Sequence, residues 1–198
     1  NGLQFNSAVG VFFLHIAEGF MSLNYIDLDD STKKFMLKEI EFDKENNSFY
    51  LSNFLTAQGK TVWPSLLEEA SQHDDAWLEQ EILNRGLLAT HYPRRKPNST
   101  EIIQAKVPHT AARTLAEGEF NRLFARGLSS RAIAEGIEFV EAYRARHSEN
   151  PRPESQAVIG KKFRPEEILE DLRNNPGVDT ALGVPPGPNS GITIKLVK

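Results

Sequence analysis

The chain has 198 residues and a mass of 22.2 kDa, the size of one ordinary domain or two small ones, and its 39% hydrophobic and 25% charged residues exclude a disordered chain, a collagen and a coiled coil. The absence of cysteine excludes disulfides, thiolate zinc sites and cysteine nucleophiles, and it suits a reducing cytoplasm such as that of a bacterium. The net charge of −4 is unevenly distributed along the chain. Residues 1–90 are acidic, with 6 Lys and Arg against 14 Asp and Glu, whereas residues 91–150 are mildly basic, with 10 against 7, and residues 151–198 have 7 against 6.

Four helices and a short strand are predicted in the first 86 residues. Asn6 or Ser7 can cap a helix that is apolar nearly all round, and its longest apolar run, residues 8–17, is about half the length needed to cross a membrane. We therefore expect no membrane span and no membrane partner. Three further helices are expected after capping residues, with a short strand between the first two of them; the caps are Asp29–Ser31, Thr56 and Asp74–Asp75, and the strand is residues 48–51.

A β-hairpin with a basic tip is predicted next. Two extended runs, residues 87–92 and 101–107, flank a segment whose Pro, Asn and Ser residues are typical of a loop. This loop holds three adjacent cations, Arg94, Arg95 and Lys96, which are suited to contact phosphates. Simple solvation of a charged turn explains the same residues without any partner, so both interpretations stay open.

A long helix dominates the rest of the chain. It is expected from about residue 110 to residue 136, with Gly118 and Gly127 at places where another segment packs closely. The elements expected after it are a strand or a continuation of the helix (137–144), an exposed connector (147–156), a helix from Pro165 to about Asn174, and a terminal strand (192–197).

The long helix carries a dense polar group between its apolar positions. Glu117, Glu119 and Arg122 would suit an acid, a base and an anion clamp, but opposite charges three or four residues apart also pair along a helix surface. Arg126 has no obvious opposite partner at such a spacing. We interpret Arg122 and Arg126 as phosphate contacts rather than catalytic groups, and we predict no catalytic residue, no cofactor and no metal site.

Residues 176–191 form a loop with four prolines and four glycines. A long loop of this kind in a compact domain is often functional, and its one charged residue, Asp179, together with Asn189, is our candidate for contact with a partner. Alternatively, residues 189–191 form the turn of a hairpin that joins residues 180–184 to the terminal strand. The sequence does not decide between these alternatives.

These elements predict an α+β fold that is mostly helical. Residues 31–107 have the element order of a winged helix, namely helix, short strand, helix, helix, strand, basic loop and strand, although other compact α+β domains share this order. We expect a winged-helix-like unit in residues 1–108, packed against a second part, residues 109–198, with the long helix, the connector, a short helix, the Gly/Pro loop and the terminal strand. The helix of residues 74–85 has a net charge of −3, which phosphates would repel.

Three functions follow from these patterns. The leading prediction is a non-catalytic cytoplasmic module that binds DNA or RNA through Arg94, Arg95 and Lys96, with help from Arg122 and Arg126. The second is a protein-interaction or self-assembling component that uses the winged unit or the Gly/Pro loop to contact another protein or another copy of itself. The third, for which the sequence offers least, is an enzyme that acts on phosphate esters.

Overall fold

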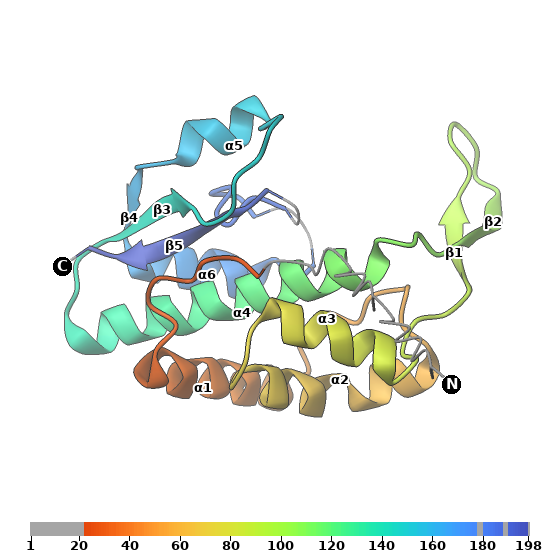
Figure 1. The fold of residues 1–198 in the computed structure, drawn as a ribbon, viewed down its shortest axis with the longest axis horizontal. Helices are drawn as coiled ribbons and strands as arrows, with labels where there is room; N and C mark the ends of the chain where they lie inside the picture. Colours follow the sequence, from red (N-terminus) through yellow and green to blue (C-terminus); the bar gives the residue numbers. More distant parts are fainter. Residues whose placement is uncertain (1–21, 178–179, 188–189, 198) are drawn as a thin grey trace, which may run out of the picture.

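The computed structural model of the protein describes residues 22–177, 180–187 and 190–197. About 48% of these residues are helical, and two small antiparallel sheets complete the described part of the fold (Figure 1). The predicted α+β class is therefore confirmed. The helix expected after Asn6 or Ser7, and the two loop residues Asp179 and Asn189, lie outside the described residues.

Helices and strands alternate in blocks along the described part of the chain. Their bounds are α1 (Asp30–Asn46), α2 (Ala57–Ala70), α3 (Asp75–Asn84), β1 (His91–Arg95), β2 (Ile102–Lys106), α4 (Ala111–Glu135), β3 (Val140–Arg144), α5 (Pro153–Val158), β4 (Lys162–Phe163), α6 (Pro165–Asn174) and β5 (Ile192–Leu196). Strands β1 and β2 form one antiparallel sheet, and the second sheet has the order β4-β3-β5.

The first three described helices begin where their capping residues predict. The side chains of Asp29, Thr56 and Asp74 each accept a hydrogen bond from the backbone N–H three residues further on. Gly86, with a φ of +60°, follows α3 and ends it, because glycine adopts the left-handed backbone without a steric penalty. These helix boundaries depend on contacts within a few residues of each other.

The long helix α4 lies at the centre of the molecule. Helices α1 and α3 pack against one side of it, and α6 and β5 pack against another (Figure 1). At Gly127, a Cβ atom would lie 2.6 Å from Met36 Cγ and 2.8 Å from Met36 N, so glycine permits α4 to cross α1 closely. The sequence predicted close packing at Gly127, and the structure shows that α1 is the segment that packs there. Core residues come from both sides of residue 108, and the two predicted parts therefore share one hydrophobic core.

The C-terminal sheet decides two alternatives that the sequence left open. Residues 140–144 form strand β3 rather than a continuation of α4, which ends at Gly136 with a φ of +70°. Strand β5 pairs antiparallel with β3 along its whole length. Residues 180–184 are not a strand, so the alternative hairpin between them and β5 is wrong, because β3 is the neighbour that β5 takes. The expected connector also differs, since Pro153 begins helix α5 within it.

The short strand expected at residues 48–51 does not form. The backbone N–H of Ser48 donates to the carbonyl of Asp43 at the end of α1, and no strand is paired with this segment in the described part of the chain. An isolated antiparallel bridge joins Leu55, just before α2, to Leu88, just after α3. The order of the remaining elements up to the β1–β2 hairpin is the predicted one.

Candidate nucleic-acid interface

The hairpin is paired further towards its tip than the sequence suggests. Strand β1 contains Arg94 and Arg95, which lie opposite Ile103 and Ile102 of β2, so Lys96 alone of the three cations follows the strand. Arg94 and Arg95 lie on opposite faces of the hairpin, because successive residues of a strand point in opposite directions. The three adjacent cations are therefore divided between two faces and the turn.

One face of the hairpin carries two of its four permanent cations together with a histidine. The register puts Arg95 on the same face as His91 and Lys106, since residues opposite each other in an antiparallel pair share a face. All three residues are exposed. Sequence reasoning missed Lys106 as a candidate contact, and the signal that could have found it is this register, which places Lys106 opposite His91.

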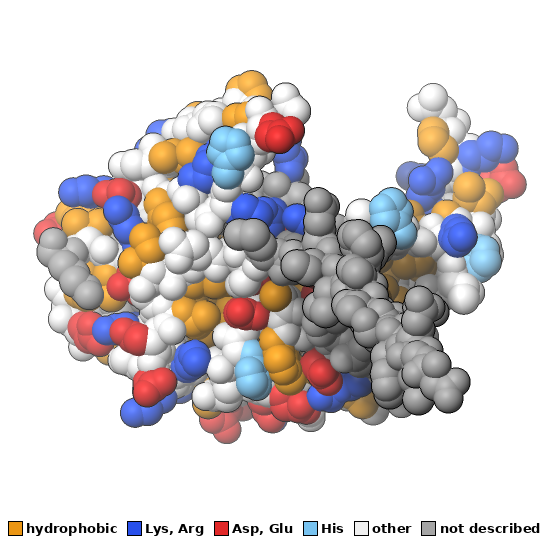
Figure 2. Space-filling view, viewed as in Figure 1, with side chains coloured by type: hydrophobic (Ala, Val, Ile, Leu, Met, Phe, Trp, Pro, Cys, Tyr) orange, Lys and Arg blue, Asp and Glu red, His pale blue; other side chains and the backbone are white. Residues whose placement is uncertain are grey.

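The other face of the hairpin joins it to the body of the protein. Tyr92 of β1 makes an edge-to-face contact with Phe54, with ring centroids 4.8 Å apart. Beyond this contact the hairpin projects away from the helices (Figure 1). Figure 2 shows Lys, Arg and His side chains gathered on the projecting part. The hairpin thus offers a basic surface that the other described residues do not cover.

Positive charge exceeds negative charge on this hairpin. Between residues 91 and 109 the chain has Arg94, Arg95, Lys96 and Lys106 as permanent cations and Glu101 as its one carboxylate. The Lys96 Nζ lies 3.3 Å from Glu101 Oε2, and both side chains are more than half exposed. An exposed ion pair of this kind contributes about 0–1 kcal/mol, so a phosphate can readily replace Glu101 as the partner of Lys96.

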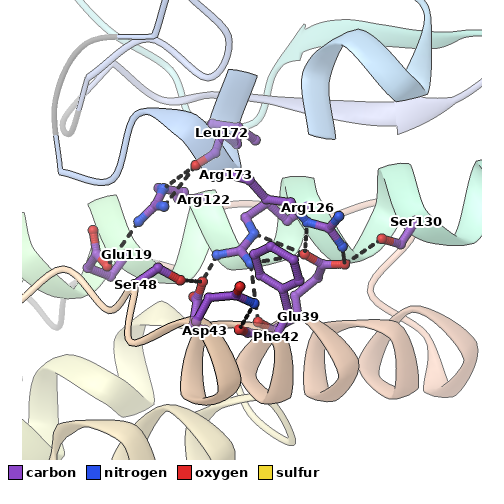
Figure 3. A network of polar contacts seen from close by, with 11 residues as sticks. Glu39, Phe42, Asp43, Ser48, Glu119, Arg122, Arg126, Ser130, Leu172 and Arg173 are labelled. Carbon is purple, nitrogen blue, oxygen red and sulfur yellow. Dashed lines mark hydrogen bonds and ion pairs between the residues drawn. The ribbon is translucent and has the colours of Figure 1, made fainter. Parts of the chain in front are cut away.

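Arg126, in contrast, lies in the interior. Its side chain donates to Glu39 Oε2 at 3.0 Å and to Asp43 Oδ2 at 2.6 Å, both on α1 (Figure 3). Arg173 and Ser130 also donate to Glu39. The interpretation of Arg126 as a cation without an opposite partner is therefore wrong, because its partners come from another helix rather than from its own.

Arg122 is buried as well. Its Nε and Nη2 both donate to the carbonyl oxygen of Leu172 in α6, at 3.2 and 2.8 Å, and its Nη1 lies 3.7 Å from Glu119 Oε2 (Figure 3). Burial lowers the pKa of Arg122, and burial also raises the pKa of Glu119 to about 7. Arg122 and Arg126 therefore do not extend the basic surface of the hairpin.

Other charged residues of α4 form ion pairs both within the helix and with residues outside it. Arg131 donates to Glu135 at 2.7 Å, one turn further along the helix. Glu117 has an ion-pair partner outside the helix, since Arg146 Nη2 lies 2.8 Å from its Oε2. The dense polar group of the long helix thus ties α4 to its neighbours as well as to itself.

Within the residues that the structure describes, no three His, Asp or Glu side chains gather closely enough to hold a metal ion. The helices of the same residues are all too short or too polar to cross a membrane. Comparisons of the chain with protein-family models, with curated proteins and with solved structures find no match.

Proposed function

We propose that the protein is a non-catalytic cytoplasmic module that binds nucleic acid through its β1–β2 hairpin. The observation that carries the proposal is a projecting two-stranded ribbon with His91, Arg95 and Lys106 on one exposed face and Lys96 in its turn. The major groove of duplex DNA admits a two-stranded β-ribbon. Lys and Arg side chains that contact the phosphates beside the groove increase the affinity of a protein for the duplex.

We further propose that α1, α2, α3 and the hairpin are a variant of the winged-helix arrangement. The element order supports this, as does the bridge between Leu55 and Leu88 at the position of the short first strand. In DNA-binding proteins with a helix-turn-helix core, a helix enters the major groove. Helix α3 with its flanking residues has a net charge of −3, so here the hairpin is the contact with phosphates and α3 faces away from them.

Fluorescence anisotropy with labelled duplex DNA, single-stranded DNA and RNA tests the proposal. If Arg95, Lys96 and Lys106 each neutralise one phosphate of duplex DNA, affinity should fall about 40-fold between about 50 mM and about 200 mM salt, because each contact adds about −0.9 to the slope of log K against log salt. The double variant R95A/K106A should reduce that slope by about 1.8 units.

A matched control removes the same charge elsewhere. Lys161 and Lys162 are exposed and belong to the β4 region, so K161A/K162A should leave the affinity and its salt slope nearly unchanged. No binding to any of the three nucleic acids at the lower salt concentration would refute the proposal. Equal losses for the two double variants would mean that net charge, rather than the hairpin, produces the binding.

A second candidate function, contact with another protein or with a second copy of the chain, is favoured by Ile102. This residue is 62% exposed and shares the hairpin face with Arg95, an unusual place for a large aliphatic side chain. Multi-angle light scattering distinguishes the candidates. A change of oligomeric state in I102S would favour the second function, whereas loss of nucleic-acid binding in R95A/K106A with an unchanged molar mass would favour the first.

A further inference from the structure

A cavity of about 400 Å³ lies beside the middle of α4. Its walls come from residues 50–54 before α2, from α4, from the end of α6 and from described residues of the Gly/Pro loop. Its volume falls within the range of about 300–1,000 Å³ that is usual for small-molecule sites. The sequence singled out both the polar group of α4 and the Gly/Pro loop, and the structure brings these two segments to the same cavity.

Arg122 lines this cavity, and some N–H donors of its guanidinium have no hydrogen-bond acceptor among the described residues. A guanidinium has five N–H donors, and the Leu172 carbonyl accepts from Nε and from Nη2. The nearest carboxylate, that of Glu119, lies 3.7 Å from Nη1, which is beyond hydrogen-bond distance. The end of the guanidinium formed by Nη1 and Nη2 can therefore donate two parallel hydrogen bonds to one oxyanion. Arg122 is 9% exposed, so water competes poorly for this position.

The cavity also has an unpaired acceptor and an apolar wall. Asn121 is 4% exposed, and its Nδ2 donates to the carbonyl of Ile192, whereas its Oδ1 has no hydrogen-bond partner among the described residues. Leaving a buried oxygen unpaired is costly, about 1–3 kcal/mol, so a donor on a ligand would relieve this cost. Tyr50 and Phe54 also line the cavity and supply aromatic surface.

Glycine keeps the aromatic wall in place. Gly177 lines the cavity with a φ of +72°, and a Cβ atom at this position would overlap the ring of Tyr50. The Tyr50 ring thus lies directly against the backbone of the Gly/Pro loop. This contact explains why the loop needs a glycine at this point, and it gives the cavity a flat aromatic surface in addition to the polar residues of α4.

We propose that this cavity binds a small aromatic oxyanion, whose carboxylate or phosphoryl group takes the free end of the Arg122 guanidinium and whose ring packs against Tyr50 and Phe54. A hydroxyl or amino group on such a ligand would donate to Asn121 Oδ1. This inference goes beyond the proposed binding of nucleic acid and does not depend on it, because the hairpin cations contribute nothing to the cavity.

Glu119 should make the binding of an anion in this cavity depend on pH. The charged groups that face Glu119 are Arg122 and Arg126 of α4 and Asp43 of α1. Burial, together with the negative charge of Asp43, outweighs the two arginines and raises the pKa of Glu119 to about 7. An anion at Arg122 favours the neutral form of Glu119, which no longer repels it. Affinity for an anion that does not itself titrate should therefore fall about tenfold between about pH 6 and about pH 8, as the protonated fraction of Glu119 falls.

Isothermal titration calorimetry with benzoate, phenyl phosphate and inorganic phosphate tests the proposal. We expect benzoate or phenyl phosphate to bind more tightly than inorganic phosphate, and which of the two binds better identifies the oxyanion. R122K should weaken binding at least about tenfold, because an ammonium cannot donate two parallel hydrogen bonds. In E119Q the affinity for benzoate should no longer depend on pH, while E135Q, the same substitution at an exposed position of α4, should behave as the wild type.

Three results would overturn the inference. The first is no heat from either aromatic probe at about 10 mM, a concentration that reveals even a millimolar Kd. The second is binding of inorganic phosphate as tightly as phenyl phosphate, which would mean that the ring contributes nothing. The third is an unchanged pH dependence in E119Q, a variant that retains the Arg122 contact with Leu172 and so stays informative if R122K fails to fold.

Discussion

Replacing Arg126 by Met is the most direct test of the buried network between α1 and α4. The guanidinium makes hydrogen bonds of 2.6–3.1 Å to the side chains of Glu39 and Asp43 and to the Glu39 carbonyl, and Arg126 is 1% exposed. Methionine has a similar length but donates no hydrogen bond. Breaking a buried ion pair by removing one partner costs about 3–5 kcal/mol, so we expect R126M to lower the free energy of unfolding by this amount.

Asp43 is the carboxylate that R126M leaves poorly paired. Glu39 keeps Arg173, whose Nε and Nη2 lie 2.9 and 2.7 Å from its oxygens, whereas Asp43 keeps a hydrogen bond from Ser48 Oγ at 2.8 Å. D43N should therefore destabilise the wild-type protein, where it removes a charged partner of Arg126. In the R126M background the same substitution should stabilise the protein by about 1–2 kcal/mol, because it removes a buried and unpaired charge.

Urea unfolding of the wild type, the two single variants and the double variant, followed by far-UV circular dichroism, measures both effects. The comparison requires similar m-values, since a changed m-value would indicate a changed denatured state. A loss below about 1 kcal/mol for R126M would show that water reaches the network and that the pair is not truly buried. The same sign and size for D43N in both backgrounds would show that Asp43 and Arg126 do not interact, and would refute the reasoning.

Two further predictions concern α4. In G127A, the better helix propensity of alanine should add about 1 kcal/mol to the free energy of unfolding, and overlap with the backbone of Met36 should remove about 2–3 kcal/mol. A denaturant titration should therefore show a net loss of about 1–2 kcal/mol. A gain in stability would contradict the close crossing of α4 and α1. The pKa of Glu119 is raised to about 7 in the folded protein. Between the pKa of this residue in the unfolded chain and about pH 7, the folded protein therefore binds one proton more than the unfolded chain. The free energy of unfolding should fall as the pH rises through that range. E119Q should therefore be more stable than the wild type by about 2–3 kcal/mol at about pH 8 and similar to it at about pH 4.5, and equal stability at the higher pH would contradict this reasoning.

The sequence by itself determined the features that depend on neighbouring residues. Asp29, Thr56 and Asp74 cap helices because a side chain and the backbone three residues on meet whenever a helix begins there. Pro165 begins α6 and Gly86 ends α3 for equally local reasons, namely a preset φ and a permitted left-handed backbone. The hairpin was predictable for the same reason, because the Pro, Asn and Ser residues typical of a loop lie next to one another between its two extended runs.

Tertiary structure alone decided which distant residues meet. Arg126 pairs with Glu39, which is 87 positions away in the chain, and Glu117 pairs with Arg146, which lies beyond the end of α4. Helical spacing could not identify either partner. The alternating apolar residues of β5 fit a strand that pairs either with residues 180–184 or with β3. In the folded protein β5 pairs with β3. The faces of the hairpin required its register, because a shift of one residue would move Arg95 to the other side. Hydrogen bonds between near neighbours can be inferred from residue order. The partner of a buried charge or of a strand edge cannot, because packing of the core decides which distant residue lies next to it.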